Sequence, residues 1–205
     1  MIRFRSPRPF SFSSKCQLIF LIAATVSPGS VAASDFQLVT ERSRVEFRIK
    51  HLAVGVVEGR FSGVTGRFKL DPSGKTVQNL ESTIEVQSLT TGIGYRDEEL
   101  KGDSFLRAGR FPEISFSSKQ SDSTGSGTKV TGILKLGGSS KQVVFNAGIP
   151  EFQKGSRGKR QVVVSGYVDI KRNALGLKLS NPRDKDDNWL GDDVLVVVTL
   201  IGQEI

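Results

Sequence analysis

The stretch Val45-Glu46-Phe47-Arg48-Ile49-Lys50 alternates apolar and charged side chains without interruption. Successive side chains of a β-strand point to opposite faces, so this pattern predicts a strand with one face toward a core and the other toward water. Turn residues such as Asp71-Pro72-Ser73-Gly74 and Gly137-Gly138 separate further strands from one another. The remaining predicted strands lie in the segments 66–70, 80–87, 114–116, 130–136, 143–149, 162–170 and 195–201.

About eight strands with short turns predict an all-β domain with an antiparallel sheet. An open sheet of that length would leave unpaired edges and one unprotected face, so we expect closure into a barrel or a two-sheet sandwich. Glycines inside the strands suit the tight bends at barrel corners, at positions Gly59, Gly63, Gly66, Gly132 and Gly166. The interior of an eight-stranded barrel is just wide enough for packed side chains or for one slender ligand.

Three stretches interrupt the alternation. Helix formers fill the first half of Tyr95–Leu106, and Gly102 ends that run, which predicts a short helical excursion lying across one mouth of the barrel. The polar stretch Asn181–Asp193 carries the single tryptophan, Trp189, and predicts a loop at one end of the barrel. Serine, threonine and glycine dominate residues 121–128, which predicts a hairpin loop.

Residues 1–33 have the composition of a secretory signal peptide. A basic front without acids precedes a short apolar run at Leu18–Val26, and Val31-Ala32-Ala33 supplies the small residues of a cleavage site. The apolar run is shorter than the ~20 residues that a membrane-spanning helix needs. We therefore expect a single exported domain at residues 34–205, located in the periplasm or secreted.

Charge and cysteine content exclude several function classes. The chain has 29 basic and 21 acidic residues, and four of the basic ones lie in the leader, which leaves 25 against 21, a net charge of +4. This mild charge is spread along the strands, so we expect no nucleic-acid partner. The single cysteine, Cys16, also lies in the leader, so the exported domain has no disulfide, thiolate nucleophile or Cys-ligated zinc.

The residue types and motifs of the sequence give little support for a catalytic function. A Ser-His-Asp arrangement would have to use His51, the single histidine, and the sequence has no Gly-x-Ser-x-Gly elbow. The acidic runs 97–99, 184–187 and 192–193 leave open a hydrolase with paired carboxylates, or a calcium site. Because basic residues accompany these acids, solvated surface is the favoured interpretation. We expect no enzymatic activity, no metal and no cofactor.

Several ordered motifs are similar to those of the YceI-like family of exported, lipocalin-like proteins. The resemblance spans about Phe36 to Ile205 and rests on Phe47-x-x-Lys50-His51-Leu52, Val57-x-Gly59-x-Phe61-x-x-Val64-x-Gly66, Thr91-Gly92-x-x-x-Arg96-Asp97-x-x-Leu100, Phe111-Pro112-x-Ile114-x-Phe116-x-Ser118, Val130-x-Gly132-x-Leu134, Ile170-x-Arg172-x-x-x-Gly176-Leu177 and Val194-x-Val196. It implies an eight-stranded antiparallel lipocalin-like barrel with a helix near one opening. It also implies an apolar tunnel that holds a polyisoprenoid, such as a polyprenyl or quinone tail, or another long-chain amphiphile, for storage or transport. The sequence departs from the family at Glu99, where relatives often have histidine, and this leaves the head-group preference open.

Alternation then assigns a set of candidate ligand-binding residues. The inward-facing set is Phe47, Ile49, Phe68, Ile84, Phe116, Leu134, Phe145 and Val164, and the candidates near a polar end are His51, Arg96 and Arg172. The phenylalanines line a tunnel in one interpretation and fill a solid core in the other.

Each polar candidate has a structural alternative. His51 can form a hydrogen bond at the rim, Arg96 with Asp97 can tie the helix to the barrel, and the stem of Arg172 can pack while its head reaches the rim. A transient membrane-surface contact and a homodimer also stay open. The alternative function is an exported interaction module with a filled barrel and a protein partner on its surface.

Overall fold

The structure is a computed structural model that describes residues 33–51, 55–155, 158–178 and 190–205. The predicted signal peptide, Trp189 and the acidic run 184–187 lie outside these residues, so the predictions made for them remain predictions. The described part contains eleven β-strands, one α-helix and two short 3₁₀ helices. Their bounds are β1 Ser34–Leu38, β2 Arg44–His51, β3 Gly55–Phe61, β4 Val64–Leu70, β5 Val77–Glu85, η1 Val86–Ser88, α1 Gly94–Lys101, β6 Glu113–Thr124, β7 Gly127–Leu136, β8 Ser139–Gly148, β9 Glu151–Lys154, β10 Arg160–Lys171, η3 Asn173–Leu175 and β11 Leu190–Glu204.

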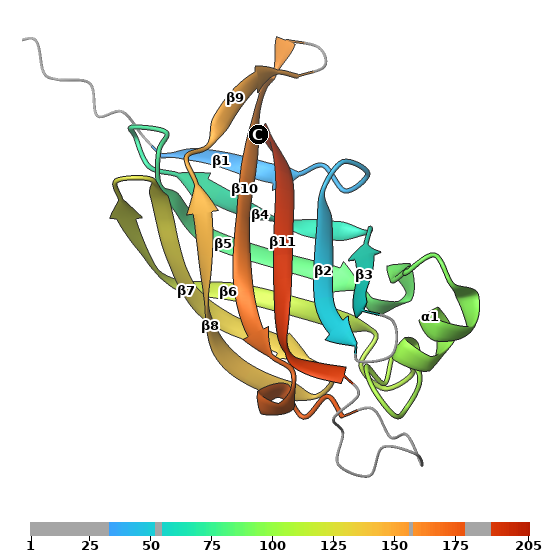
Figure 1. Cartoon of the computed structure of the whole chain (residues 1–205). Helices are drawn as coiled ribbons and strands as arrows, with labels where there is room; N and C mark the ends of the chain where they lie inside the picture. Colours follow the sequence, from blue (N-terminus) through green and yellow to red (C-terminus); the bar gives the residue numbers. More distant parts are fainter. Residues whose placement is uncertain (1–32, 52–54, 156–157, 179–189) are drawn as a thin grey trace, which may run out of the picture. The chain divides into compact units, whose positions relative to one another are not determined.

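All strand pairings are antiparallel, and they close into a barrel (Figure 1). The strand order is β3-β2-β11-β1-β4-β5-β6-β7-β8-β10-β9, and a further pairing of β10 with β11 joins the two sides. Three positions in the barrel wall are each occupied by two strands, one after the other. β1 and β2 share a position and both pair with β11, and β8 and β9 share a position and both pair with β10. The third shared position holds β4, which pairs with β1, and β3, which pairs with β2. The eleven strands thus occupy eight positions, and the predicted eight-stranded antiparallel barrel is confirmed.

The closing hairpin of β10 and β11 has the longest continuous register in the sheet. Eleven residue pairs run from Gln161 opposite Gln203 to Lys171 opposite Asp193. Valine is frequent in both strands, and such β-branched side chains pack well on a pleated, half-buried surface. Residues 190–193 therefore belong to β11, which corrects the predicted loop over residues 181–193 at its C-terminal end.

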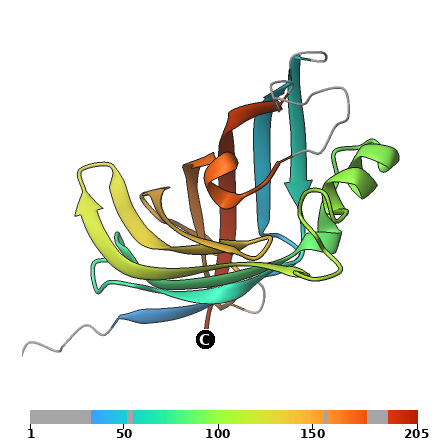
Figure 2. The same cartoon turned by 90° about the horizontal axis from the view of Figure 1, so that it is seen from below.

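Continuous strand pairing in the barrel wall stops beside β3. This strand pairs with β2 along one edge, but its other edge has a single bridge, from Arg60 to Thr90. The β4–β5 pairing ends at Val64 opposite Ile84, and the chain then passes through η1 and α1 before it re-enters the sheet as β6. Figure 2 shows α1 beside β3, away from the curved wall of β5 to β8. The predicted helical excursion is confirmed, and the helix ends at Gly102 as expected.

The predicted hairpin loop over residues 121–128 is shorter than expected. Strand β6 continues to Thr124 and β7 begins at Gly127, so only two residues turn the chain. The serine and threonine residues take part in the ladder, with Ser123 opposite Thr128. Composition alone favoured a loop, whereas backbone pairing with the partner strand determines the conformation of these residues.

One end of the barrel is a solid core. The rings of Phe36 and Phe68 stack with centroids 5.4 Å apart and an interplanar angle of 12°. Both rings are completely or almost completely buried, as are Val77, Val130 and Val162 around them. We call this region, built from β1, β4, the starts of β5, β7 and β10 and the end of β11, the packed end.

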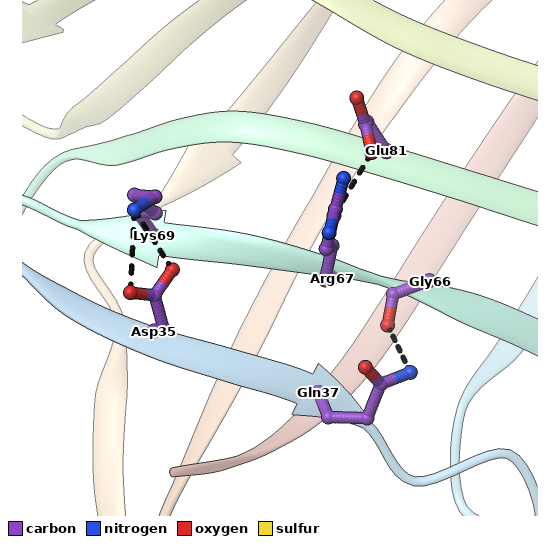
Figure 3. Close-up of polar contacts among 6 residues, drawn as sticks. All are labelled: Asp35, Gln37, Gly66, Arg67, Lys69 and Glu81. Atoms are coloured by element: carbon purple, nitrogen blue, oxygen red, sulfur yellow. Dashed lines mark hydrogen bonds and ion pairs between the residues drawn. The ribbon is translucent and has the colours of Figure 1, made fainter. Parts of the chain in front are cut away.

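The outer face of the packed end carries exposed polar contacts (Figure 3). Lys69 pairs with Asp35 at 3.1 Å, Arg67 pairs with Glu81 at 3.0 Å, and the Gln37 amide donates to the Gly66 carbonyl at 2.8 Å. Gly66 has a φ of 144°, and a Cβ there would lie 2.1 Å from the Glu81 carbonyl oxygen, so this close strand approach requires glycine.

Candidate functional site

The other end of the barrel encloses a cavity of about 240 Å³. This volume exceeds the ~150 Å³ of an engineered apolar cavity that stays dry and binds benzene. Strands β2 to β8, β10 and β11 supply most of the walls, and further lining residues come from α1, from η3 and from the segments that follow η1, α1 and η3. We call this region the hollow end.

Most of the sequence-predicted residues meet at this cavity. The apolar residues that line it are Phe47, Ile49, Ile84, Phe116, Leu134 and Phe145, and the polar candidates His51, Arg96 and Arg172 line it as well. Phe68 and Val164 do not line it, because they are buried in the packed end. Contact with a ligand stays a prediction for the whole set.

Sequence reasoning missed part of the lining. The inward face of β11 contributes Val194, Val196 and Val198, which lie opposite Ile49, Phe47 and Val45 of β2. Extending the alternation along this last strand would have found them. Six further contributors lie outside the strands, in α1, η3 and the loops, where an alternation of two residues makes no prediction: Leu89, Leu100, Phe105, Leu106, Leu175 and Leu177.

Arg172 is almost completely buried, and its guanidinium binds backbone. Nε donates to the Gly191 carbonyl at 2.8 Å, Nη1 to the Leu177 carbonyl at 2.8 Å and Nη2 to the Leu190 carbonyl at 2.6 Å. A buried charge is tolerated when it is fully hydrogen-bonded, and these contacts join the end of β10 to the start of β11. They account for the burial of Arg172 without a ligand.

Arg96 and Asp97 both bind Thr91, which precedes α1. The Asp97 carboxylate accepts the Thr91 amide at 2.7 Å and the Thr91 hydroxyl at 2.5 Å, while Arg96 Nε donates to the same hydroxyl oxygen at 2.8 Å. Burial raises the pKa of Asp97, but the hydrogen bonds from Thr91 and Thr90 and the Lys101 ammonium outweigh burial, so the pKa lies below its ordinary value. Since Thr90 bridges to Arg60 of β3, the pair attaches α1 to the rim. The structure thus supports the tethering role directly.

Glu99 lies one helical turn after Arg96 and also lines the cavity. Its side chain is exposed and forms no hydrogen bond or ion pair with the residues that the structure describes. His51 lines the same region at the end of β2, opposite Leu190 of β11 and Gly55 of β3. The cavity therefore has apolar walls, with polar groups from the strand end, the helix and the β10–β11 junction.

The described ranges contain neither a candidate metal site nor a candidate membrane-spanning helix. These residues contain no cluster of three His, Cys, Asp or Glu side chains close enough to hold a metal ion. No described helix has the length and the apolarity that crossing a bilayer requires.

Comparisons with known proteins identify relatives of the whole domain. The chain is 28% identical over 159 residues to a UPF0312 protein of Pseudomonas paraeruginosa, an alignment that covers 77% of this chain and 83% of the relative. The YceI protein of Campylobacter jejuni is 28% identical, with a TM-score of 0.65 over 76% of this chain and 90% of that protein. A polyisoprenoid-binding domain from Saccharophagus degradans, implicated in plant cell wall breakdown, shares the fold at 16% identity, with a TM-score of 0.62 over 83% of this chain and 98% of that domain. Residues 36–201 match the model of the YceI-like domain, so the chain belongs to the YceI-like domain family.

Proposed function

We propose that this protein binds the chain of a long isoprenoid or similar amphiphilic lipid in the cavity at the hollow end, for storage or transport. The observation that carries the proposal is an interior cavity walled by apolar side chains inside an otherwise well-packed barrel. Apolar surface removed from water contributes about 25 cal/mol per Å², so such a cavity binds a hydrocarbon chain with few polar contacts.

One comparison and the cavity itself support this proposal. The relative from Saccharophagus degradans is described as polyisoprenoid-binding, and it shares the barrel. The cavity also favours this proposal over the alternative function, an interaction module whose barrel is filled solid. We further propose that the protein is exported after cleavage of the leader, that it catalyses no reaction, and that the lipid head group lies near His51, Arg96 and Glu99.

Extraction of the purified protein tests the proposal. Protein prepared without detergent is extracted with organic solvent, and the extract is analysed by mass spectrometry. We expect a long-chain lipid at a stoichiometric ratio to protein. A clean extract, together with no binding of added isoprenoid, would refute the proposal.

A pair of neighbouring substitutions separates the interior from the surface. Phe116→Glu places a charge in the cavity wall, where desolvation of the carboxylate is costly, so we expect lipid to be lost from the extract. Ser117→Glu places the same charge on the exposed face of the same strand and serves as the control, with lipid retained. Undiminished lipid in folded Phe116→Glu protein would contradict the cavity assignment.

A further inference from the structure

Three of the phenylalanine rings at the cavity lie directly against glycines of neighbouring strands. A Cβ at Gly59 would lie 2.3 Å from Phe47 Cζ, one at Gly132 would lie 2.5 Å from Phe116 Cζ, and one at Gly166 would lie 2.7 Å from Phe145 Cζ. These distances are far below van der Waals contact, so each ring occupies the space that a side chain of the neighbouring strand would take. All three phenylalanines line the cavity.

The glycines occupy inward-facing positions, which is where a side chain would point into the barrel. Gly59 is the register partner of Phe47, and its inward neighbours Val57 and Phe61 also line the cavity. Gly132 alternates with the inward Val130 and Leu134, and Gly166 alternates with Val164 and Val168. A ring that covers the backbone of a glycine lies along the wall, as in the aromatic covering of strand glycines used in designed sheets.

We infer that Gly59, Gly132 and Gly166 set the width of the cavity by letting the Phe47, Phe116 and Phe145 rings lie along its wall, and that the width suits a slender single chain instead of a fused-ring lipid. This inference rests on the proposed lipid-binding function and specifies the class of lipid. With a larger residue at any of the three glycines, the paired ring moves toward the centre of the cavity, because its own position in the strand points inward.

Gly59 offers the cleanest substitution. The atoms that its Cβ would meet belong to the side chains of Phe47 and Thr91, whereas Cβ atoms at Gly132 and Gly166 would also meet the backbone oxygens of Ser117 and Asn146. Gly59→Ala therefore displaces a ring without forcing strands apart.

Gly202 at the packed end is a matched control. Its Cβ would lie 2.7 Å from Phe68 Cζ and 2.9 Å from Phe36 Cβ, so Gly202→Ala displaces a ring in the same way. Neither Phe36 nor Phe68 lines the cavity.

The test uses the full-length protein and measures binding of the linear fluorescent polyene cis-parinaric acid and its displacement by geranylgeraniol, a linear isoprenoid alcohol. We expect Gly59→Ala to weaken binding of both about tenfold, since a displaced ring removes a large part of the contact area. We expect Gly202→Ala to lower the thermal midpoint but to bind both compounds as the wild type does. Equal binding by the wild type and folded Gly59→Ala would overturn the inference, as would an equal loss in Gly202→Ala.

Two further variants cover a failure of Gly59→Ala to fold. The double variant Gly59→Ala/Phe47→Leu removes the clashing ring and is expected to restore binding of geranylgeraniol. Phe47→Leu alone widens the cavity, and we expect it to bind the fluorescent sterol dehydroergosterol and the wild type not to bind it. Sterol binding by the wild type would count against the width argument. A wild type that binds none of these compounds would instead refute the proposed function, so the two failures are distinguishable.

Discussion

The two ends of this barrel use the same alternating strands to different effect. At the packed end the rings of Phe36 and Phe68 stack on each other across β1 and β4 and fill the interior. At the hollow end the Phe47, Phe116 and Phe145 rings lie on glycines, and α1 with its flanking segments takes the place of a strand beside β3. The difference teaches that apolar alternation specifies an inside without specifying whether that inside is full.

The two ends also differ in their contribution, because the packed end contributes mainly to stability and the hollow end to the proposed binding. Dispersion and burial are greatest where side chains contact neighbours on all sides, as at the packed end. A wall residue that faces a cavity lacks partner atoms on one side and contributes less to folding. The hollow end is instead stabilised by hydrogen bonds, which Arg172 donates to a backbone carbonyl and Asp97 accepts from Thr91.

The largest expected effect is at the packed end. Phe68→Ala removes a buried, stacked ring and should lower the free energy of unfolding by about 3–5 kcal/mol. Phe116→Ala at the cavity should cost about 1–2 kcal/mol, because its ring already faces empty space. Urea unfolding followed by fluorescence or circular dichroism measures both. Equal losses would mean that the hollow end is as tightly packed as the other.

Substitution of Arg172 tests whether these hydrogen bonds stabilise the hollow end. Arg172→Met keeps the apolar stem but leaves the carbonyls of Gly191, Leu177 and Leu190 without their donor, and we expect a loss of about 2–4 kcal/mol. Lys171→Met is the neighbouring control, because Lys171 and its ion-pair partner Asp193 are exposed, so we expect this substitution to change the stability little. A loss in Arg172→Met no greater than in the control would rule out the structural role.

Asp97 gives a pH-dependent test of the helix tether. Its pKa in the folded protein lies below the ordinary value of 3.8, so the ionised carboxylate stabilises the fold above that pH. As the pH falls from about 4 through the folded pKa, this contribution is lost.

Asp97→Asn should cost about 1–2 kcal/mol at neutral pH and should flatten the acid dependence of unfolding. Glu98→Gln, on the exposed face of the same helix, serves as the control. An unchanged acid profile in Asp97→Asn would show that the carboxylate does not hold α1 at the rim.

The smallest effect concerns the head group. Glu99 presents an exposed carboxylate at the cavity, which repels an anionic head, so Glu99→Gln should strengthen binding of a polyprenyl phosphate by about threefold to tenfold. Binding of the uncharged polyprenol should not change, and the gain should shrink at high salt. A gain of the same size for both lipids would show that Glu99 does not select the head group.

Much of the fold could be predicted from the sequence because the alternation of apolar and polar residues along a strand is a local pattern. The run from Val45 to Lys50 predicted its own inward face, and Gly102 predicted the end of α1. Local composition failed at residues 121–128, where β6 and β7 pair with each other up to a two-residue turn, and at residues 190–193, where pairing with distant residues of β2 and β10 extends β11. The same dependence on distant residues hid Leu100 and Leu177, which reach the cavity from a helix and a loop.

By itself, the sequence determined the alternating strands, the position of the helix and the inward side of each segment, because each follows from neighbours within a few residues. Tertiary structure alone decided that Phe68 fills the barrel while Phe116 lines a cavity, although both occupy inward positions in similar strands. The reason is physical: whether space remains beside a ring depends on what the strands opposite and adjacent supply. Glycines lie against rings at both ends, as Gly202 does against Phe68, but at the packed end a stacked Phe36 fills the remaining space, whereas the residues around Phe116 leave a cavity.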